Sequence, residues 1–118
     1  MKMKRYSRNG VIVLKPQERR IDASNAVGFK ESLSMHLGDG SPNIVINLDE
    51  VRFIDSSGLG VLVSALKEIG SNGEIKLCHL REGVRSIFEL TRLDTVFDLH
   101  GSEGGAVESF KSKQGLTE

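Results

Sequence analysis

Cysteine, tryptophan and long apolar runs are scarce in this sequence, and each scarcity argues against a class of protein. Cys78 is the only cysteine among 118 residues, which rules out an internal disulfide and favours a cytoplasmic setting. With no tryptophan and one tyrosine, the chain lacks the aromatic residues on which nucleic-acid bases stack. No apolar run approaches the ~20 residues of a membrane span, so we expect no membrane insertion.

Length and charge point to a single soluble domain. A chain of 118 residues favours one domain, which we expect over residues 1–113, with a frayed tail at 114–118. The formal net charge is zero, but residues 1–20 hold seven lysines and arginines against one acid. This basic arm could contact nucleic acid or lipid, but we favour a solvated edge strand and expect no direct nucleic-acid partner.

Strand and helix patterns alternate along the chain. Asn9-Gly10 is a strong hairpin-turn signal between two strands. We expect a hairpin of 2–8 with 10–15. The next element is a helix through Ala26, Phe29, Leu33 and Leu37, which follows a cap at Asp22 or Ser24 and stops at Gly38 and Gly40. After it we expect strand 43–48, helix 57–70, strand 74–80, helix 82–91, strand 95–99 and a last helix through Ala106, Val107 and Phe110. The order predicts an α/β fold: a mixed sheet of four to five strands, with about four helices packed mainly on one face. The apolar stripes Ala26-Phe29-Leu33, Leu62-Val63-Leu66 and Ile87-Phe88 should face that sheet.

The segment 55–60, Asp-Ser-Ser-Gly-Leu-Gly, stands where an apolar strand changes to a helical pattern. A phosphate-binding loop of the Walker type would need a lysine that this segment lacks, and a dinucleotide fingerprint would need a glycine or alanine where Val63 stands. A serine nucleophile elbow would need glycines on both sides of the serine. We find no paired carboxylates, no metal-ligand cluster, and no spacing that ties His36, His79 or His100 to the serines. We therefore expect no enzymatic activity, no cofactor and no metal.

Two interpretations of the segment remain open on chemistry alone. In the first, Asp55 or Ser56 simply caps the helix, as such residues often do. Alternatively, a serine in the first helical turn is exposed and open to modification, with Gly58 and Gly60 keeping the surrounding surface low. A phosphate there would add a charge of about −1.5 to −2, which the helix N-terminus can accommodate.

The sequence resembles the STAS family, the domain shared by anti-sigma factor antagonists and sulfate transporters. The resemblance rests on "INLDEVRFIDSSGLGVLVSALKEI", on "RRIDASNA" and on "GEIKLCHLREGVRSIFELTRLDTVFDL". The resemblance implies a STAS-like fold and the function of an anti-sigma factor antagonist. The implied partner is an anti-sigma factor that is also a serine kinase, with a histidine-kinase-like ATPase fold. The unphosphorylated antagonist would bind this partner, so that the sigma factor is released. The family often has a glycine three residues before the Asp22 position, where this chain has Arg19.

The resemblance also implies roles for particular residues. The kinase would phosphorylate Ser56, with Ser57 as the neighbouring alternative, and a metal-dependent serine phosphatase would reverse the modification. The implied partner-binding residues are Asp22, Asp55, Ser56, Ser57, Gly58, Leu59 and Gly60. Two other roles for the same fold stay open: an accessory subunit of a lipid-transport ATPase, and a scaffold component of a stress-sensing complex.

Overall fold

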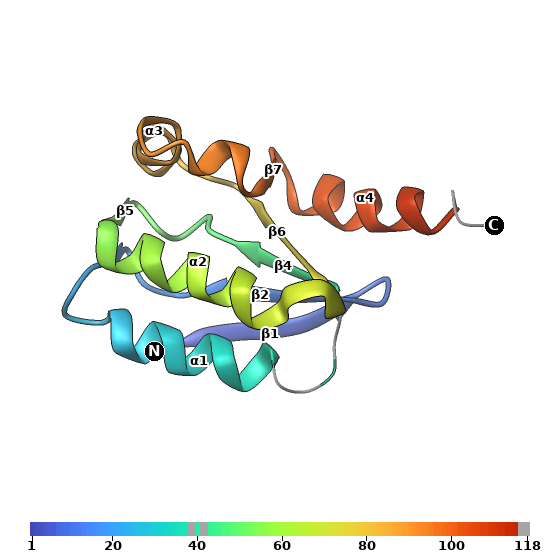
Figure 1. Ribbon diagram of the computed structural model, residues 1–118, viewed down its shortest axis with the longest axis horizontal. Helices are drawn as coiled ribbons and strands as arrows, with labels where there is room; N and C mark the ends of the chain where they lie inside the picture. The colour runs from blue at the N-terminus through green and yellow to red at the C-terminus, as the bar shows by residue number, and fades with distance from the viewer. Residues whose placement is uncertain (38–39, 41–42, 116–118) are drawn as a thin grey trace.

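The chain begins with the expected hairpin. The computed structural model describes residues 1–37, 40 and 43–115, with side chains as far as Phe110 (Figure 1). Strand β1 (Met3–Arg8) pairs antiparallel with β2 (Val11–Pro16). Asn9 and Gly10 join them with φ angles of 51° and 79°, the left-handed conformation that a two-residue hairpin turn requires. This prediction from the sequence is confirmed.

Three further strands complete a five-stranded sheet in the order β1-β2-β4-β6-β7. Strands β4 (Asn43–Asn47), β6 (Glu74–Cys78) and β7 (Asp98–His100) all run parallel to β2. A separate parallel pair, β3 (Arg20–Ile21) with β5 (Phe53–Ile54), continues beyond the ends of β2 and β4. The mixed sheet that the sequence predicted is confirmed, while the short β3–β5 pair is an addition to it.

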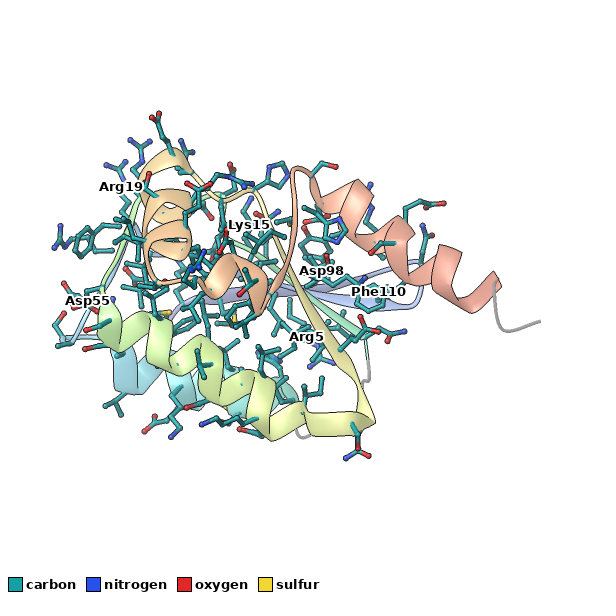
Figure 2. All side chains as sticks on the ribbon, turned by 45° about the horizontal axis from the view of Figure 1, so that its top comes forward. Arg5, Lys15, Arg19, Asp55, Asp98 and Phe110 are labelled. Carbon is teal, nitrogen blue, oxygen red and sulfur yellow. The ribbon has the colours of Figure 1, made fainter. Side chains whose placement is uncertain are left out.

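The helices lie on both faces of the sheet, in unequal numbers. The helices α1 (Ala26–Leu37), α2 (Ser56–Ile69) and α3 (Glu82–Leu90) contribute to the larger core, which includes Leu14, Ile46 and Leu77 of the sheet. The last helix, α4 (Glu103–Gly115), covers the opposite face, where Ala106, Val107 and Phe110 pack on Val11, Val13, Val45 and Cys78 (Figures 1 and 2). The expected packing mainly on one face is therefore confirmed, and α4 is the exception.

Two expectations about single elements were wrong. The strand predicted at 95–99 starts later than expected: a short 3-10 turn forms at Leu93–Thr95, and β7 shares only residues 98–99 with the predicted range. Phe97 turns inward instead, with its ring 5.7 Å from that of Phe88 in an edge-to-face contact, and Val96 is left 56% exposed. A buried aromatic contact outweighs the β propensity of this short apolar run.

The second correction concerns α2, whose buried face is rotated from the expected stripe. Leu62 is fully buried, but Val63 and Leu66 are only half-buried, and Val61 and Ala65 are buried in their place. The reason is α1, which packs beside α2 and covers this second side of the helix. At the chain end, α4 continues two residues beyond the expected limit of 113, and the remainder of the expected frayed tail, like Gly38, lies outside the described residues.

The first turn of α4 is anchored by one carboxylate, that of Glu103. Its oxygens accept hydrogen bonds from the Tyr6 hydroxyl, from Arg8 at 2.8 Å and from the Asn47 amide at 2.9 Å. Its backbone N–H donates to His79 Nε2 at 3.2 Å. Burial alone would raise the pKa of Glu103, but the three side-chain hydrogen bonds outweigh it and hold the pKa below the ordinary value of 4.5. The start of α4 is thereby tied to β1, to β4 and to the loop after β6.

Substituting Glu103 by glutamine is expected to lower the free energy of unfolding by about 1–2 kcal/mol at pH 7, because charge-assisted hydrogen bonds are lost. The depressed pKa means that this contribution is present above about pH 4.5 and is lost as the pH falls through the folded-state pKa of Glu103. Urea unfolding of wild type and Glu103→Gln across this range tests the prediction, with Glu108→Gln, on an exposed position of α4, as the matched control. A stability difference that did not shrink in acid would contradict it.

Candidate functional site

The β3–β5 pair places the two expected site loops side by side. The register pairs Arg20 with Phe53 and Ile21 with Ile54, and the Asp55 N–H donates to the Ile21 carbonyl at 3.1 Å. Asp22 and Asp55, one residue beyond each strand, therefore emerge next to each other at one end of the molecule. Two segments far apart in the sequence are joined here into one surface.

Asp55 caps the N-terminus of α2. Its backbone is extended, and its Oδ1 accepts hydrogen bonds from the N–H groups of Ser57 at 2.9 Å and Gly58 at 3.2 Å. The helix begins at Ser56, one residue earlier than expected. Ser56 is exposed, whereas Ser57 is half-buried. The capping role that the sequence left open thus belongs to Asp55, and the Ser56 hydroxyl lies at the surface.

Removing the cap is expected to destabilise the domain by about 1 kcal/mol in Asp55→Ala, because two amide groups lose their acceptor. Asp55→Asn is the matched control, since asparagine caps about as well as aspartate. Urea unfolding of the three proteins gives the comparison. An equal loss of stability in both variants would show that the charge of Asp55 matters and its capping geometry does not.

Asp22 organises its own loop. Its Oδ1 accepts hydrogen bonds from the Ser24 hydroxyl at 2.6 Å and from the Ser24 N–H at 2.9 Å, while Oδ2 lies 3.4 Å from Arg20 Nε. The hydrogen bonds from Ser24 are the main cause that lowers the pKa of Asp22. Asn25 bridges the same loop, accepting from the Asp22 N–H and donating to the Arg20 carbonyl. Asp22 is therefore an ionised, half-buried carboxylate at the edge of the surface on which Ser56 lies.

The two glycines of the motif differ in their surroundings. A Cβ on Gly58 would lie 2.6 Å from Ile54 Cγ1 and 2.8 Å from Ile21 Cγ2, so this glycine lets α2 approach the β3–β5 pair. The expectation that Gly58 lowers the outer surface was wrong, because it faces the core. Gly60 is exposed and a Cβ there would meet nothing within 4 Å, as expected of a glycine on an open surface. Leu59 is 5% exposed and belongs to the core, so of the apolar part of the motif only Gly60 lies open.

Sequence reasoning missed one feature of this surface, a cation–π pair beside the aspartates. The Arg20 guanidinium lies 4.1 Å from the centre of the Phe53 ring, and Phe53 is 36% exposed. Each residue is on a two-residue strand, and only their pairing brings them together. The alternation of outward Phe53 with buried Ile54 was the one local signal of such a strand.

Groups that often serve in catalysis lie elsewhere. Cys78 is buried under α4, and burial is the main cause that raises the pKa of its thiol to about 12, so it stays protonated at neutral pH. His36 contacts Arg5, His79 accepts from the Glu103 backbone, and His100 lies 3.2 Å from Asp98. In the part of the chain that the structure describes, no three His, Cys, Asp or Glu side chains are grouped as metal ligands would be.

Comparison with known proteins places this geometry in a family. The family model of the STAS domain matches residues 2–106, so the chain belongs to the STAS domain family. The anti-sigma-B factor antagonist of Staphylococcus aureus is 32% identical over 89 residues, which cover 75% of this chain and 81% of that protein. This relative and the two solved structures described next are named as anti-sigma factor antagonists.

Solved structures agree with the fold. The crystal structure of a Thermotoga maritima protein assigned as an anti-sigma factor antagonist superimposes with a TM-score of 0.82 at 30% identity, over 91% of this chain and 92% of that one. An anti-sigma factor antagonist from Mycobacterium paratuberculosis gives a TM-score of 0.84 at 24% identity, over 92% of both chains, a likeness of fold. Over the described residues, none of the helices combines the length and the apolar character needed to cross a bilayer.

Proposed function

We propose that this chain is an anti-sigma factor antagonist that acts as a phosphorylation-controlled partner switch. In its unphosphorylated form it binds an anti-sigma factor that is also a serine kinase, and the sigma factor is released. The kinase phosphorylates Ser56, the complex separates, and a metal-dependent serine phosphatase restores the first state. The observation that carries the proposal is the exposed Ser56 hydroxyl on the first residue of α2, directly after the Asp55 cap. The names of the relatives support the choice of partner.

Ser56 fits the role of phosphate acceptor better than Ser57. A kinase must bring its nucleotide and catalytic groups around the hydroxyl, which requires an exposed side chain on an open surface. Ser56 meets that requirement, and Gly60, one turn further along α2, leaves room above it. Ser57 is half-buried and its N–H is already bound to Asp55. The greater exposure of Ser56 therefore supports it as the proposed acceptor.

The partner surface follows from the same geometry. Ser56 and Gly60 are exposed and would meet the kinase directly, with the Asp22 and Asp55 carboxylates beside them. Ser57, Gly58 and Leu59 would act mainly by fixing the position of α2 against the β3–β5 pair. In this role the chain is a substrate and a binding partner, and it needs no catalytic group, cofactor or metal of its own.

The test uses a protein of histidine-kinase-like ATPase fold that is captured on this chain from a lysate of the native cell and then purified. We expect the purified pair to form a complex with nucleotide bound, and prolonged incubation with ATP to add one phosphate to wild type and to Ser57→Ala, but none to Ser56→Ala. Intact-protein mass spectrometry reads the phosphate, and native gel or gel filtration reads the complex. Phosphorylation of Ser56→Ala at wild-type rate would move the acceptor to another residue. Stable binding to a transporter ATPase or to a very large assembly, with no phosphorylation, would favour the accessory-subunit or scaffold role.

A further inference from the structure

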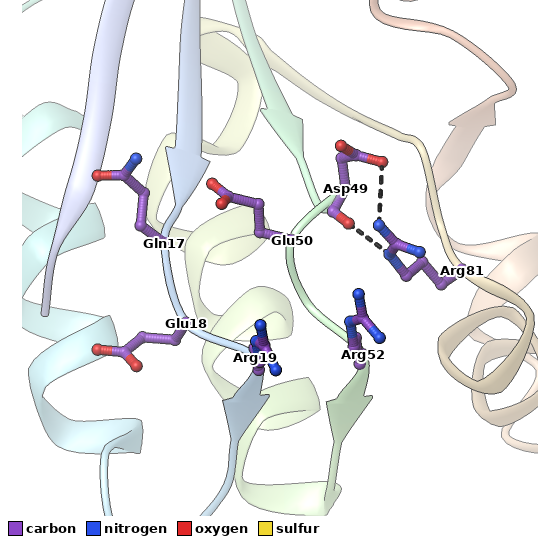
Figure 3. Close-up of a pocket in the computed structure, with 7 residues that line it drawn as sticks. All are labelled: Gln17, Glu18, Arg19, Asp49, Glu50, Arg52 and Arg81. Carbon is purple, nitrogen blue, oxygen red and sulfur yellow. Dashed lines mark hydrogen bonds and ion pairs between the residues drawn. The ribbon is translucent and has the colours of Figure 1, made fainter.

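A polar hollow lies at the carboxyl ends of the three central parallel strands. Its volume is about 340 Å³, within the range of small-ligand sites. Its lining comes from the segments after β2, β4 and β6: Gln17, Glu18, Arg19, Asp49, Glu50, Arg52 and Arg81 (Figure 3). In open parallel sheets this edge is where ligands bind, because loops from several strands converge there. The hollow is separated from Ser56 by the length of β5.

Two arginines stand together at this hollow. The Arg19 carbonyl accepts hydrogen bonds from the N–H groups of Arg52 at 2.8 Å and Phe53 at 3.1 Å, which fixes the two arginine backbones side by side. Figure 3 shows both side chains at the starts of β3 and β5. Within the described residues, neither guanidinium has a carboxylate at ion-pair distance. Guanidinium groups on two neighbouring segments can both donate to a single oxyanion.

The third arginine of the hollow, Arg81, already has a partner in Asp49. Arg81 Nε donates to the Asp49 carbonyl at 2.5 Å, and its terminal nitrogen lies 3.7 Å from Asp49 Oδ1. Lys15 Nζ lies 4.0 Å from the other oxygen of Asp49. The charge of Asp49 is thus balanced by Arg81 and Lys15, and it does not compete for Arg19 and Arg52. Arg19 and Arg52 are therefore the two residues of the hollow that can bind an anionic ligand.

Glu18 and Glu50 line the same hollow, and in the described part of the chain neither carboxylate takes part in an ion pair or side-chain hydrogen bond. Figure 3 shows Glu50 set apart from the two arginines, along the β4–β5 connection. Carboxylates are acceptors, so they suit hydroxyl groups of a ligand and repel its anionic part. Glu50 therefore provides an acceptor for hydroxyl groups apart from the two arginines.

We propose that this hollow binds a small phosphorylated polyol, with its phosphate between Arg19 and Arg52 and its hydroxyls on Glu50. Planar guanidinium groups bind phosphate oxygens in pairs, which gives both attraction and orientation. The proposal is independent of phosphorylation at Ser56. It adds a small-molecule site at the start of β3 and β5, the two strands that lead into Asp22 and Asp55.

The test is calorimetric titration of the whole chain with ribose 5-phosphate, inorganic phosphate and ribose. We expect ribose 5-phosphate to bind at least tenfold more tightly than inorganic phosphate, and ribose to show no binding. Arg19→Gln and Arg52→Gln should each weaken ribose 5-phosphate roughly tenfold or more, the effect of losing a charge-assisted contact. Lys67→Gln, which removes the same charge from an exposed position on α2, should leave the affinity unchanged. Glu50→Gln should weaken ribose 5-phosphate while leaving inorganic phosphate as tight or tighter.

Amide chemical shifts locate the bound molecule. Changes centred on 17–19 and 49–52, retained in Ser56→Ala, are the expected result. No saturable binding at millimolar ribose 5-phosphate would overturn the proposal, as would an equal loss in Lys67→Gln, which indicates attraction by net charge alone. Shift changes centred on Ser56 would also overturn it and place the anion at the start of α2. Loss of kinase binding in Arg19→Gln, without sugar-phosphate binding to wild type, would assign the arginines to a protein interface instead.

Discussion

Phosphorylation of Ser56 is expected to lower the affinity for the kinase roughly 100-fold or more while the domain keeps its shape. The phosphate adds a charge of about −1.5 to −2 at an exposed helix N-terminus, where a negative charge is favourable by about 0.3–1 kcal/mol. The amides of Ser57 and Gly58 already donate to the Asp55 carboxylate, so the cap stays in place and the phosphate is not needed to complete it. Nothing in this arrangement requires α2 or the sheet to move.

The loss of affinity comes from the surface that the phosphate enters. Asp55 directly precedes Ser56, and Asp22, which pairs with Arg20, follows the neighbouring strand, so the phosphate adds negative charge to a surface that already holds two carboxylates and one arginine. A partner closely packed against this surface must bury the phosphate without a matching cation or withdraw from it. An unpaired buried charge costs several kcal/mol, and each 1.4 kcal/mol is a factor of ten in affinity, which gives the expected 100-fold.

Amide chemical shifts and kinase binding of the two forms test both halves of this prediction. Shift changes confined to the Asp22 loop and to 55–62, together with the loss of binding, are expected. Ser56→Ala should keep full affinity and resist the kinase, and Ser56→Asp should weaken binding only partly because it brings about one charge and less bulk. Shift changes spread through the five-stranded sheet and α3 would instead show a conformational switch.

The elements that the sequence predicted well are those whose signal is local. The hairpin followed from Asn9-Gly10, and the central strands followed from short apolar runs between turn residues. The face that a helix covers is a global property, so the stripe of Ala106, Val107 and Phe110 could predict a helix but not that it lies opposite α1 and α2. The wrong start of the strand predicted at 95–99 has the same origin, since only the fold shows that Phe97 meets Phe88.

The site divides in a similar way. Asp55 and Ser56 were found because a capping residue and the first helical turn are adjacent in the sequence. The Arg20–Phe53 contact and the pair Arg19 with Arg52 were not found, because each joins segments about thirty residues apart through strands of two residues. Such strands are too short for any alternation to be recognised. Gly58 was found as a motif residue but was expected at the outer surface. It faces the core, and which way it faces depends on how α2 is rotated about its axis.

The opposite surroundings of the two motif glycines lead to the last prediction. Gly58→Ala is expected to lower the free energy of unfolding by about 2 kcal/mol. Its methyl group would overlap Ile54 and Ile21, both fully buried, so α2 or the β3–β5 pair must shift. Overpacking of this kind costs about 1–3 kcal/mol, and the better helix propensity of alanine returns less than about 1 kcal/mol.

Gly60→Ala is the matched substitution, since it adds the same methyl group two residues along the same helix, where no atom lies within 4 Å. It is expected to stabilise the domain by about 0.5–1 kcal/mol, the propensity difference between glycine and alanine. The same methyl group stands on the open surface beside Ser56, so kinase affinity should fall roughly tenfold, about 1.4 kcal/mol, as close contact is prevented. Urea unfolding and kinase titration of both variants separate the two roles. If Gly60→Ala is more stable and binds the kinase as tightly as wild type, the partner contact lies away from this turn of α2. If Gly58→Ala has wild-type stability, the two isoleucines move aside without a cost in free energy.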